Sequence, residues 1–194
     1  MSLPLDQRPV IVALAGPNGA GKTTLYKAHL QNAGLRFVNA DVLAQELRIE
    51  PYAAARVADT LRKELMKQRE SFVFETVFSD PVGEKRAFLK SAAEAGYNTI
   101  LCFIAIATHQ VSEERVAMRL SQGGHDVPSE KIIQRFPRIL ENLKAALREL
   151  PRVWVFDNSD LRTPYRLVAV YESGRQVKLH RPVPRWLKPL LPKS

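Results

Sequence analysis

The sequence is poor in cysteine, since its 194 residues contain only Cys102. A single thiol cannot form a disulfide within the chain, so a disulfide-stabilised scaffold is excluded. Cys102 lies inside the apolar stretch of residues 99–107, which predicts a buried structural thiol rather than a reactive one. The lack of disulfides favours the cytoplasm as the location of the protein.

Long apolar runs are also absent. No run approaches the roughly 20 residues that cross a bilayer, which argues against a membrane-spanning helix and against a membrane partner. Residues 1–9 lack the apolar core of a secretory signal. Both absences agree with a cytoplasmic protein.

The composition is that of one soluble globular domain, with 45% hydrophobic and 25% charged residues. The formal net charge of +9 favours anionic substrates such as nucleotides and phosphosugars. The basic residues are scattered over predicted helices and the C-terminal segment instead of gathering with aromatic residues. Nucleic acid is therefore not the expected partner.

Short apolar runs alternate with amphipathic segments along the chain. Strands are predicted at residues 10–15, 35–39, 72–75, 98–107 and 153–156, and helices at 23–33, 41–47, 51–70, 82–95, 112–121 and 129–149. This alternation predicts an α/β fold, a P-loop NTPase-type three-layer sandwich with a mostly parallel five-stranded sheet.

The C-terminal region differs from this alternation. Residues 165–171 and 176–180 are joined through Ser173-Gly174 and indicate a C-terminal hairpin. Residues 181–194 hold four prolines and several basic side chains, which predicts an extended surface tail. We therefore expect a P-loop kinase-like domain over residues 1–180 followed by a tail.

The most informative motif is a glycine-rich loop between the first strand and the first helix. Its residues, with one further threonine, are Gly16, Pro17, Asn18, Gly19, Ala20, Gly21, Lys22, Thr23 and Thr24. Such a loop directs backbone N–H groups toward phosphates at a helix N-terminus. Lys22 supplies a cation for the β- and γ-phosphates, and Thr23 supplies a hydroxyl for Mg²⁺. ATP and Mg²⁺ are the predicted cofactors.

Acidic residues follow two of the predicted strands. Asp41 comes directly after the second strand, and Glu75 ends the third, followed by Thr76. The carboxyl ends of parallel strands meet at the edge where the P-loop opens. Asp41 is a candidate base for an acceptor hydroxyl as well as a candidate helix cap. Glu75 and Thr76 are candidates for the acceptor site, while a structural ion pair remains the alternative for Glu75.

Two arginines, Arg115 and Arg119, lie one helical turn apart and share a face of their predicted helix. Arginine donors at this position would stabilise charge on a transferred phosphoryl group. The helix leads into Gly123-Gly124, as a closing lid would require, and His125 follows in the same loop. A solvated surface pair is the alternative for the two arginines.

Together these motifs resemble the zeta toxin family of P-loop kinases. The resemblance covers residues 10–159, in the family's order, and rests on Gly-Pro-Asn-Gly-Ala-Gly-Lys-Thr-Thr at 16–24, Phe-Val-Asn-Ala-Asp at 37–41, Phe-Val-Phe-Glu-Thr at 72–76, Ser-Glu-Glu-Arg-Val at 112–116 and Gly-Gly-His-Asp-Val-Pro at 123–128. The compact length is similar to that of the short chromosomal zeta-like proteins.

The resemblance implies transfer of the ATP γ-phosphate to a small hydroxyl-bearing acceptor, in the best-known members the 3′-hydroxyl of UDP-N-acetylglucosamine. It implies that Lys22 binds phosphate, Asp41 is the base, Glu75 contacts substrate and Arg115 stabilises the γ-phosphate. It also implies an antitoxin protein as a partner. Toxin members carry a second lid arginine; here either His125 or Arg119 takes that role.

Two alternatives remain open at this stage. One is a nucleotide-gated ATPase or binding module that acts on nucleic acid or a protein partner. The other is a kinase for polynucleotide ends, which would need a basic channel on the acceptor side.

Overall fold

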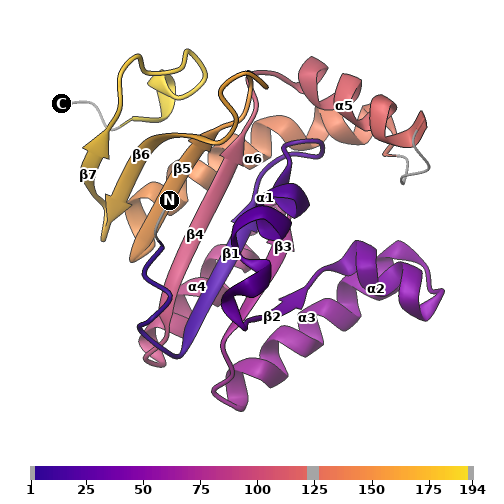
Figure 1. Cartoon of the computed structure of the whole chain (residues 1–194), viewed down its shortest axis with the longest axis vertical. Helices are drawn as coiled ribbons and strands as arrows, with labels where there is room; N and C mark the ends of the chain where they lie inside the picture. The colour runs from indigo at the N-terminus through magenta and orange to yellow at the C-terminus, as the bar shows by residue number, and fades with distance from the viewer. Residues whose placement is uncertain (1–2, 122–126, 192–194) are drawn as a thin grey trace.

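The computed structural model describes residues 3–121 and 127–191. A seven-stranded sheet forms its centre, in the order β2-β3-β1-β4-β5-β6-β7 (Figure 1). The strands are β1 (Val10–Ala15), β2 (Arg36–Val38), β3 (Phe72–Thr76), β4 (Asn98–Ala105), β5 (Arg152–Asp157), β6 (Arg166–Glu172) and β7 (Arg175–Leu179). The first five are parallel to one another, β6 pairs antiparallel with β5, and β7 pairs antiparallel with β6.

Helices cover both faces of the sheet, so the fold is a three-layer α/β sandwich (Figure 1). They are α1 (Lys22–His29), α2 (Ala40–Leu47), α3 (Pro51–Lys67), α4 (Glu84–Glu94), α5 (His109–Ser121) and α6 (Ser129–Glu149). Two short 3₁₀ turns, η1 (Gln31–Ala33) and η2 (Lys188–Leu190), complete the described elements.

The central strands are continuous apolar runs because both of their faces are buried. In β1, Ile11 and Ala13 join the core cluster under α3, α4 and α6, whereas Val12 and Leu14 join the cluster under α1. All four side chains are fully buried. Successive residues of a strand point to opposite faces, so a strand between two helical layers must be apolar at every position.

The predicted count of five strands is too low. The C-terminal hairpin forms as predicted, but β6 pairs with β5, from Arg152 opposite Glu172 to Asp157 opposite Arg166, and so extends the same sheet. The reason lies in the burial of β6: residues 168–171 are buried on both faces. A strand whose two faces are both apolar must be covered on both sides, and β6 achieves this by joining the sheet between the helical layers.

The spacing of apolar residues in 51–70 favours Ala54, Val57, Ala58, Leu61 and Leu65 as the buried face of α3, and the structure corrects this. Ala54, Ala58 and Leu65 are buried, but Arg62 is buried as well, while Val57 and Leu61 are exposed. The Arg62 guanidinium lies over the Phe74 ring, 4.9 Å from its centroid, and pairs with Asp59. Burial lowers the pKa of Arg62 to about 10. An aromatic face and a carboxylate thus replace the water that this cation loses.

The C-terminal segment is not the extended surface tail that the sequence predicted. Leu187 is fully buried, and Val183, Trp186 and Leu190 pack against the core cluster beneath α6. The Trp186 indole N–H donates to Asp157 Oδ1 (3.4 Å). Prolines made the segment irregular, but its apolar side chains still bury themselves against the sheet. The predicted boundary at residue 180 stays a prediction.

Within residues 3–121 and 127–191, no helix combines the length and the apolar character that crossing a membrane requires.

Candidate active site

The glycine-rich loop lies between β1 and α1, at the carboxyl edge of the sheet (Figure 1). Gly16 begins it at φ 142°, and a Cβ there would collide with the Ile104 carbonyl oxygen of the neighbouring strand. Only glycine fits this position. Gly19 is similarly confined, because a Cβ would lie 2.9 Å from the Cβ of Arg115 on α5. The loop is therefore shaped by the elements on either side of it.

Helix α1 begins with Lys22 and has no side-chain cap at its N-terminus. Its first-turn N–H groups have no partner further back in the helix, so they remain available to an anion. The Lys22 ammonium donates to the carbonyl oxygens of Gly16 and Pro17, both at 3.0 Å. Burial lowers the pKa of Lys22, whereas the carboxylates of Glu75 and Asp41 raise it. The lysine thus folds over the loop that would hold the phosphates.

The outward side of the loop is held by side chains from two other elements. On α5, Ser112 donates to the Asn18 carbonyl (2.6 Å) and Arg115 to the Gly19 carbonyl (3.5 Å). After β5, the amide of Asn158 donates to the Ala20 carbonyl, and the Tyr165 hydroxyl to the Gly21 carbonyl, both at 2.9 Å. We call Ser112, Arg115, Asn158 and Tyr165 the loop brace. Four consecutive carbonyls each have a donor, so the loop conformation is fixed without a ligand.

Sequence reasoning missed most of the loop brace. Arg115 bridges the Gly19 carbonyl and the Ser159 carbonyl, the latter at 3.2 Å, which the sequence did not predict. Its predicted contact with the γ-phosphate stays a prediction. Tyr165 was seen only as the start of a hairpin strand. No local pattern marks a hydroxyl or amide that bonds a carbonyl more than 130 residues away. Contacts of this kind become visible only in the folded chain.

Glu75 emerges beside the P-loop, because its strand β3 pairs with β1 so that Glu75 lies opposite Leu14. The Thr23 hydroxyl donates to Glu75 Oε2 (3.2 Å). The second oxygen, Oε1, is buried and has no hydrogen-bond partner. Burial raises the pKa of Glu75, while Lys22 and the Thr23 hydroxyl lower it. A buried carboxylate oxygen without a donor is costly, so this atom is suited to a cation or an incoming donor.

Asp41 is the second residue of α2, the helix that follows the edge strand β2, and β2 lies next to the strand β3 that carries Glu75. Asn39, not Asp41, caps this helix: its Oδ1 accepts from the Asp41 N–H (2.8 Å) and the Val42 N–H (3.3 Å). The Asp41 side chain is therefore free of the capping role that the sequence left open, and it is exposed. Its negative charge raises the pKa of both Lys22 and Glu75, so it acts on the same small region.

The two predicted lid arginines have different environments. Arg115 belongs to the loop brace, whereas the positive charge of Arg119 lowers the pKa of Lys22 and of Glu75. Arg119 lies on the same helix as Arg115, one turn further along, and its charge acts on the region of Lys22 and Glu75. His125 lies outside the described residues, so its predicted role stays a prediction.

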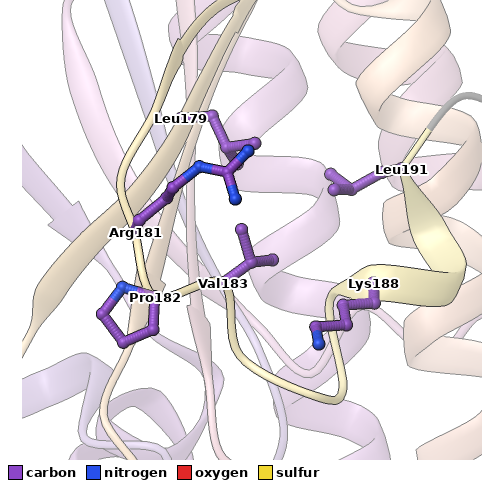
Figure 2. Close-up of a pocket in the computed structure, with 6 residues that line it drawn as sticks. All are labelled: Leu179, Arg181, Pro182, Val183, Lys188 and Leu191. Atoms are coloured by element: carbon purple, nitrogen blue, oxygen red, sulfur yellow. The ribbon is translucent and has the colours of Figure 1, made fainter. Parts of the chain in front are cut away.

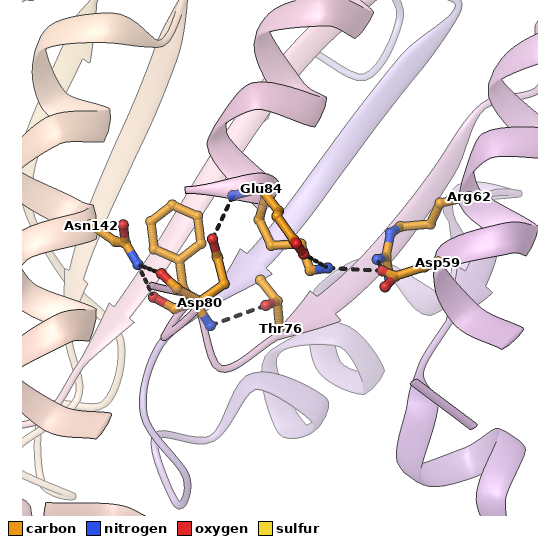
Figure 3. Close-up of polar contacts among 8 residues, drawn as sticks. Asp59, Arg62, Thr76, Asp80, Glu84 and Asn142 are labelled. Atoms are coloured by element: carbon orange, nitrogen blue, oxygen red, sulfur yellow. Dashed lines mark hydrogen bonds and ion pairs between the residues drawn. The ribbon is translucent and has the colours of Figure 1, made fainter. Parts of the chain in front are cut away.

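The loop between β3 and α4 is anchored from α6 (Figure 3). The buried amide of Asn142 donates to the Phe78 carbonyl (3.0 Å) and to the Asp80 carbonyl (2.9 Å). Phe78 adopts a left-handed φ of 63°, and its N–H donates to the Thr76 hydroxyl (3.0 Å). Asp80 Oδ1 accepts from the Glu84 N–H, while Asp80 Oδ2 is buried without a partner. A strained loop next to Thr76 is thus held in place by one amide.

No group of three or more His, Cys, Asp and Glu side chains among the described residues could hold a metal ion. Mg²⁺ in phosphate sites needs less, because it keeps waters and takes one or two protein oxygens beside those of the phosphates. Thr23 Oγ1 and the unpartnered Glu75 Oε1 provide oxygens of this type. The residues present therefore fit a magnesium ion shared with a nucleotide.

Comparisons with known proteins agree with this architecture. Residues 11–144 match the family model described as an AAA domain. An uncharacterized protein of Haemophilus influenzae is 28% identical over 126 residues, which cover 62% of this chain and 88% of that protein.

Among solved structures, a chain of the AvrRxo1-ORF1:AvrRxo1-ORF2 complex has a TM-score of 0.70 at 19% identity, covering 93% of this chain and 65% of its own. That complex has also been solved with sulphate ions and with ATP. A chain of the PezAT toxin–antitoxin system of Streptococcus pneumoniae has a TM-score of 0.56 at 18% identity, covering 83% of this chain and 72% of its own.

These likenesses establish the P-loop kinase-like fold. The chain spans less than two thirds of the AvrRxo1 complex chain that it matches, 62% in the sulphate structure.

Proposed function

The chain belongs to the AAA domain family, and on that premise we propose that it is an ATP- and Mg²⁺-dependent kinase that phosphorylates a hydroxyl group. The observation that carries the proposal is the position of Asp41. Its charge acts on Lys22 and Glu75, beside a loop built to bind phosphates. A carboxylate without a structural partner at that position is suited to take a proton from an acceptor.

Nucleotide binding requires a rearrangement of Lys22. Its ammonium leaves the carbonyls of Gly16 and Pro17 and contacts the β- and γ-phosphates, while the N–H groups of the loop and of α1 receive the remaining oxygens. The loop brace keeps the backbone unchanged. Thr23 and Glu75 would hold Mg²⁺, which would supply positive charge to neutralise the phosphates.

In the transfer step, Asp41 accepts the proton of the acceptor hydroxyl. The hydroxyl oxygen forms a bond to the γ-phosphorus, and the bond from that phosphorus to the β–γ bridging oxygen breaks, leaving ADP. Lys22 and Arg119 stabilise the negative charge on the transferred group, since both cations act on the region around Glu75. Arg115 supports this step indirectly through the loop and the Ser159 carbonyl.

The acceptor we propose is a small molecule of the kind that zeta toxins use, with a nucleotide-activated amino sugar as the first candidate. We assign Glu75 and Thr76 to the proposed acceptor site, and the role proposed for His125 lies outside the described residues. An antitoxin-type protein is proposed as a regulatory partner. PezAT and the AvrRxo1 complex, which share the fold, are themselves a toxin–antitoxin system and a two-protein assembly.

The test is a screen of UDP-sugars, free sugars and nucleosides for an ATP-dependent gain in mass, followed by the variant Asp41→Asn. We expect this variant to lose roughly 10²- to 10⁴-fold in acceptor phosphorylation, the usual contribution of a general base. The dissociation constant of ATP, measured by calorimetry, should stay within about twofold. Glu46→Gln, an exposed carboxylate on the same helix, is the matched control and should behave as the wild type.

Unchanged turnover of Asp41→Asn would remove Asp41 from the mechanism. Slow ATP hydrolysis with no acceptor in the screen would instead favour a nucleotide-gated binding module.

A further inference from the structure

The C-terminal end of the chain concentrates positive charge. Residues 175–194 contain no Asp or Glu, although the whole chain has 20 of them. The Lys and Arg residues of this stretch are Arg175, Lys178, Arg181, Arg185, Lys188 and Lys193. A stretch with cations only produces a positive potential that attracts acidic partners.

Within the described part of this stretch, residues 175–191, the cations are not paired with carboxylates of the fold. The ion pairs of the neighbouring region join Arg152 to Glu172, Arg162 to Asp160 and Arg166 to Asp157. None of the ion pairs among the described residues involves a cation of residues 175–191. Their charge therefore remains available to a partner.

The same region offers an unpaired sheet edge. In the part of the chain that the structure describes, strand β7 is the last strand of the sheet and pairs only with β6. Residues 175–178 are exposed, Val177 to 60%. The outer row of backbone N–H and C=O groups on such a strand can pair with an added extended chain. Lysine and arginine on the strand discourage pairing with a second copy of itself and favour an acidic segment.

Beside the end of this strand lies a hollow of about 640 Å³ (Figure 2). We call it the C-terminal hollow; Leu179, Arg181, Pro182, Val183, Lys188 and Leu191 line it. In Figure 2 Val183 and Leu191 point toward the space, the Arg181 guanidinium extends into it beside Leu179, and Lys188 lies at its border with its ammonium directed away. An apolar floor with cations around it suits a side chain that is apolar and flanked by carboxylates.

We propose that the β7 edge and the C-terminal hollow form a docking site for an acidic, extended segment of a partner protein. The partner's backbone pairs with β7, one or two apolar side chains enter the hollow, and flanking carboxylates meet Arg181 and Lys188. The site lies apart from Lys22, Asp41 and Glu75 and stands independently of the kinase proposal.

The observations favour a peptide over nucleic acid. Single-stranded nucleic acid binds through exposed aromatic rings as well as cations. The one tryptophan of this segment, Trp186, packs against the core and donates to Asp157, so its ring is already engaged within the fold. An apolar hollow next to a strand edge can bind a side chain of an added peptide strand, whereas it contributes nothing to phosphate contacts.

The test uses the full-length protein and a fluorescein-labelled peptide in which Leu-Val is flanked on both sides by glutamates. Fluorescence anisotropy should show saturable binding that weakens with added salt. The double variant Arg181→Glu/Lys188→Glu should weaken binding by roughly tenfold or more, since two favourable charge contacts become repulsive. Lys63→Glu/Lys90→Glu makes the same charge change at exposed positions of α3 and α4 and should stay within about twofold.

Three probes separate the contributions. A peptide N-methylated at alternate residues cannot pair with β7 and should bind more weakly, and a peptide with Ser-Ser in place of Leu-Val should lose the contribution of the hollow. Oligothymidylate should bind weakly and respond equally to both double variants. Thermal unfolding confirms that each variant is folded.

Equal loss of peptide binding in both double variants, or no peptide binding by the folded wild type, would overturn the proposal. Tight oligothymidylate binding that is abolished only by Arg181→Glu/Lys188→Glu would overturn it as well and would identify a nucleic-acid surface.

Discussion

The two halves of the candidate active site differ in how completely the protein satisfies its own polar groups. On the nucleotide side, four consecutive P-loop carbonyls from Asn18 to Gly21 have side-chain donors. At the end of β3 and in the loop after it, on the proposed acceptor side, Glu75 Oε1 and Asp80 Oδ2 are buried without hydrogen-bond partners, and Glu75 Oε1 also faces the proposed magnesium position. Unsatisfied buried oxygens are rare in proteins and are tolerated where a ligand or ion completes them. The protein therefore satisfies the polar groups of the P-loop by itself, whereas the proposed acceptor side leaves two buried oxygens that a ligand or ion could complete.

The largest effect should come from Lys22→Met. This change removes the only cation of the P-loop and should reduce phosphoryl transfer by about 10³-fold or more, because charge on the γ-phosphate loses its nearest donor. Turnover and ATP affinity are the measurements. Lys27→Met, an exposed position on the same helix, serves as the control. A Lys22→Met protein that retains turnover would mean that the nucleotide side does not perform the chemistry.

Next in size is Asn142→Ala, which tests the acceptor side. The change leaves the carbonyls of Phe78 and Asp80 without their donor and should lower the free energy of unfolding by about 1–3 kcal/mol. ATP affinity should change less than twofold, because the P-loop contacts remain. Urea unfolding and calorimetry measure the two quantities, with the exposed Lys144→Ala of the same helix as control. A large loss of ATP affinity would show that the two halves are coupled.

Tyr165→Phe makes the complementary change on the nucleotide side. It removes the hydroxyl that donates to the Gly21 carbonyl and should lower the free energy of unfolding by about 0.5–1.5 kcal/mol. Here part of the loss should appear in ATP affinity, up to roughly tenfold, because the bond shapes the loop that binds phosphate. Tyr171→Phe removes a hydroxyl bonded to Gln176, away from the loop, and should leave ATP affinity unchanged. Equal ATP affinities of Tyr165→Phe and Tyr171→Phe would argue against a role of the loop brace in nucleotide binding.

The smallest effect at neutral pH concerns Cys102, in the apolar core under α1. Burial raises the pKa of its thiol to about 12. Above about pH 8.5 the unfolded chain loses this proton while the folded chain keeps it, so stability falls as pH rises, by about 1.4 kcal/mol per unit. Cys102→Ala should lack this component. Urea unfolding of both proteins between pH 7 and 10 measures it, and parallel pH profiles would contradict a buried, neutral thiol.

Much of the fold was predictable from the sequence because local patterns carry it. The apolar run of β1, the glycines of the loop and the helix after it have fixed spacings that backbone geometry requires. The position of Glu75 beside the P-loop was also predictable, because the carboxyl ends of parallel strands meet at one edge of the sheet. The count of strands was wrong, because nothing local tells whether a terminal hairpin joins a sheet or stands apart from it.

The side-chain environments were less predictable. Arg62 takes an inward position on α3, although the spacing of apolar residues favoured Leu61. It is stabilised there by the Phe74 ring and by Asp59, and only the packing of α3 against β3 brings Arg62 and Phe74 together. Arg115 turns toward the Gly19 carbonyl for the same reason. A long side chain finds its partner among groups that only the folded chain brings near.

The sequence by itself determined that this protein has a phosphate-binding loop on an α/β sheet with a carboxylate after the second strand. Those features depend on backbone conformation and strand order, which neighbouring residues specify. Only the tertiary structure decided which side chains support the loop, which carboxylate oxygens stay unpaired and where the C-terminal segment packs. These depend on burial and on contacts between residues distant in the chain, whose energies no local pattern records.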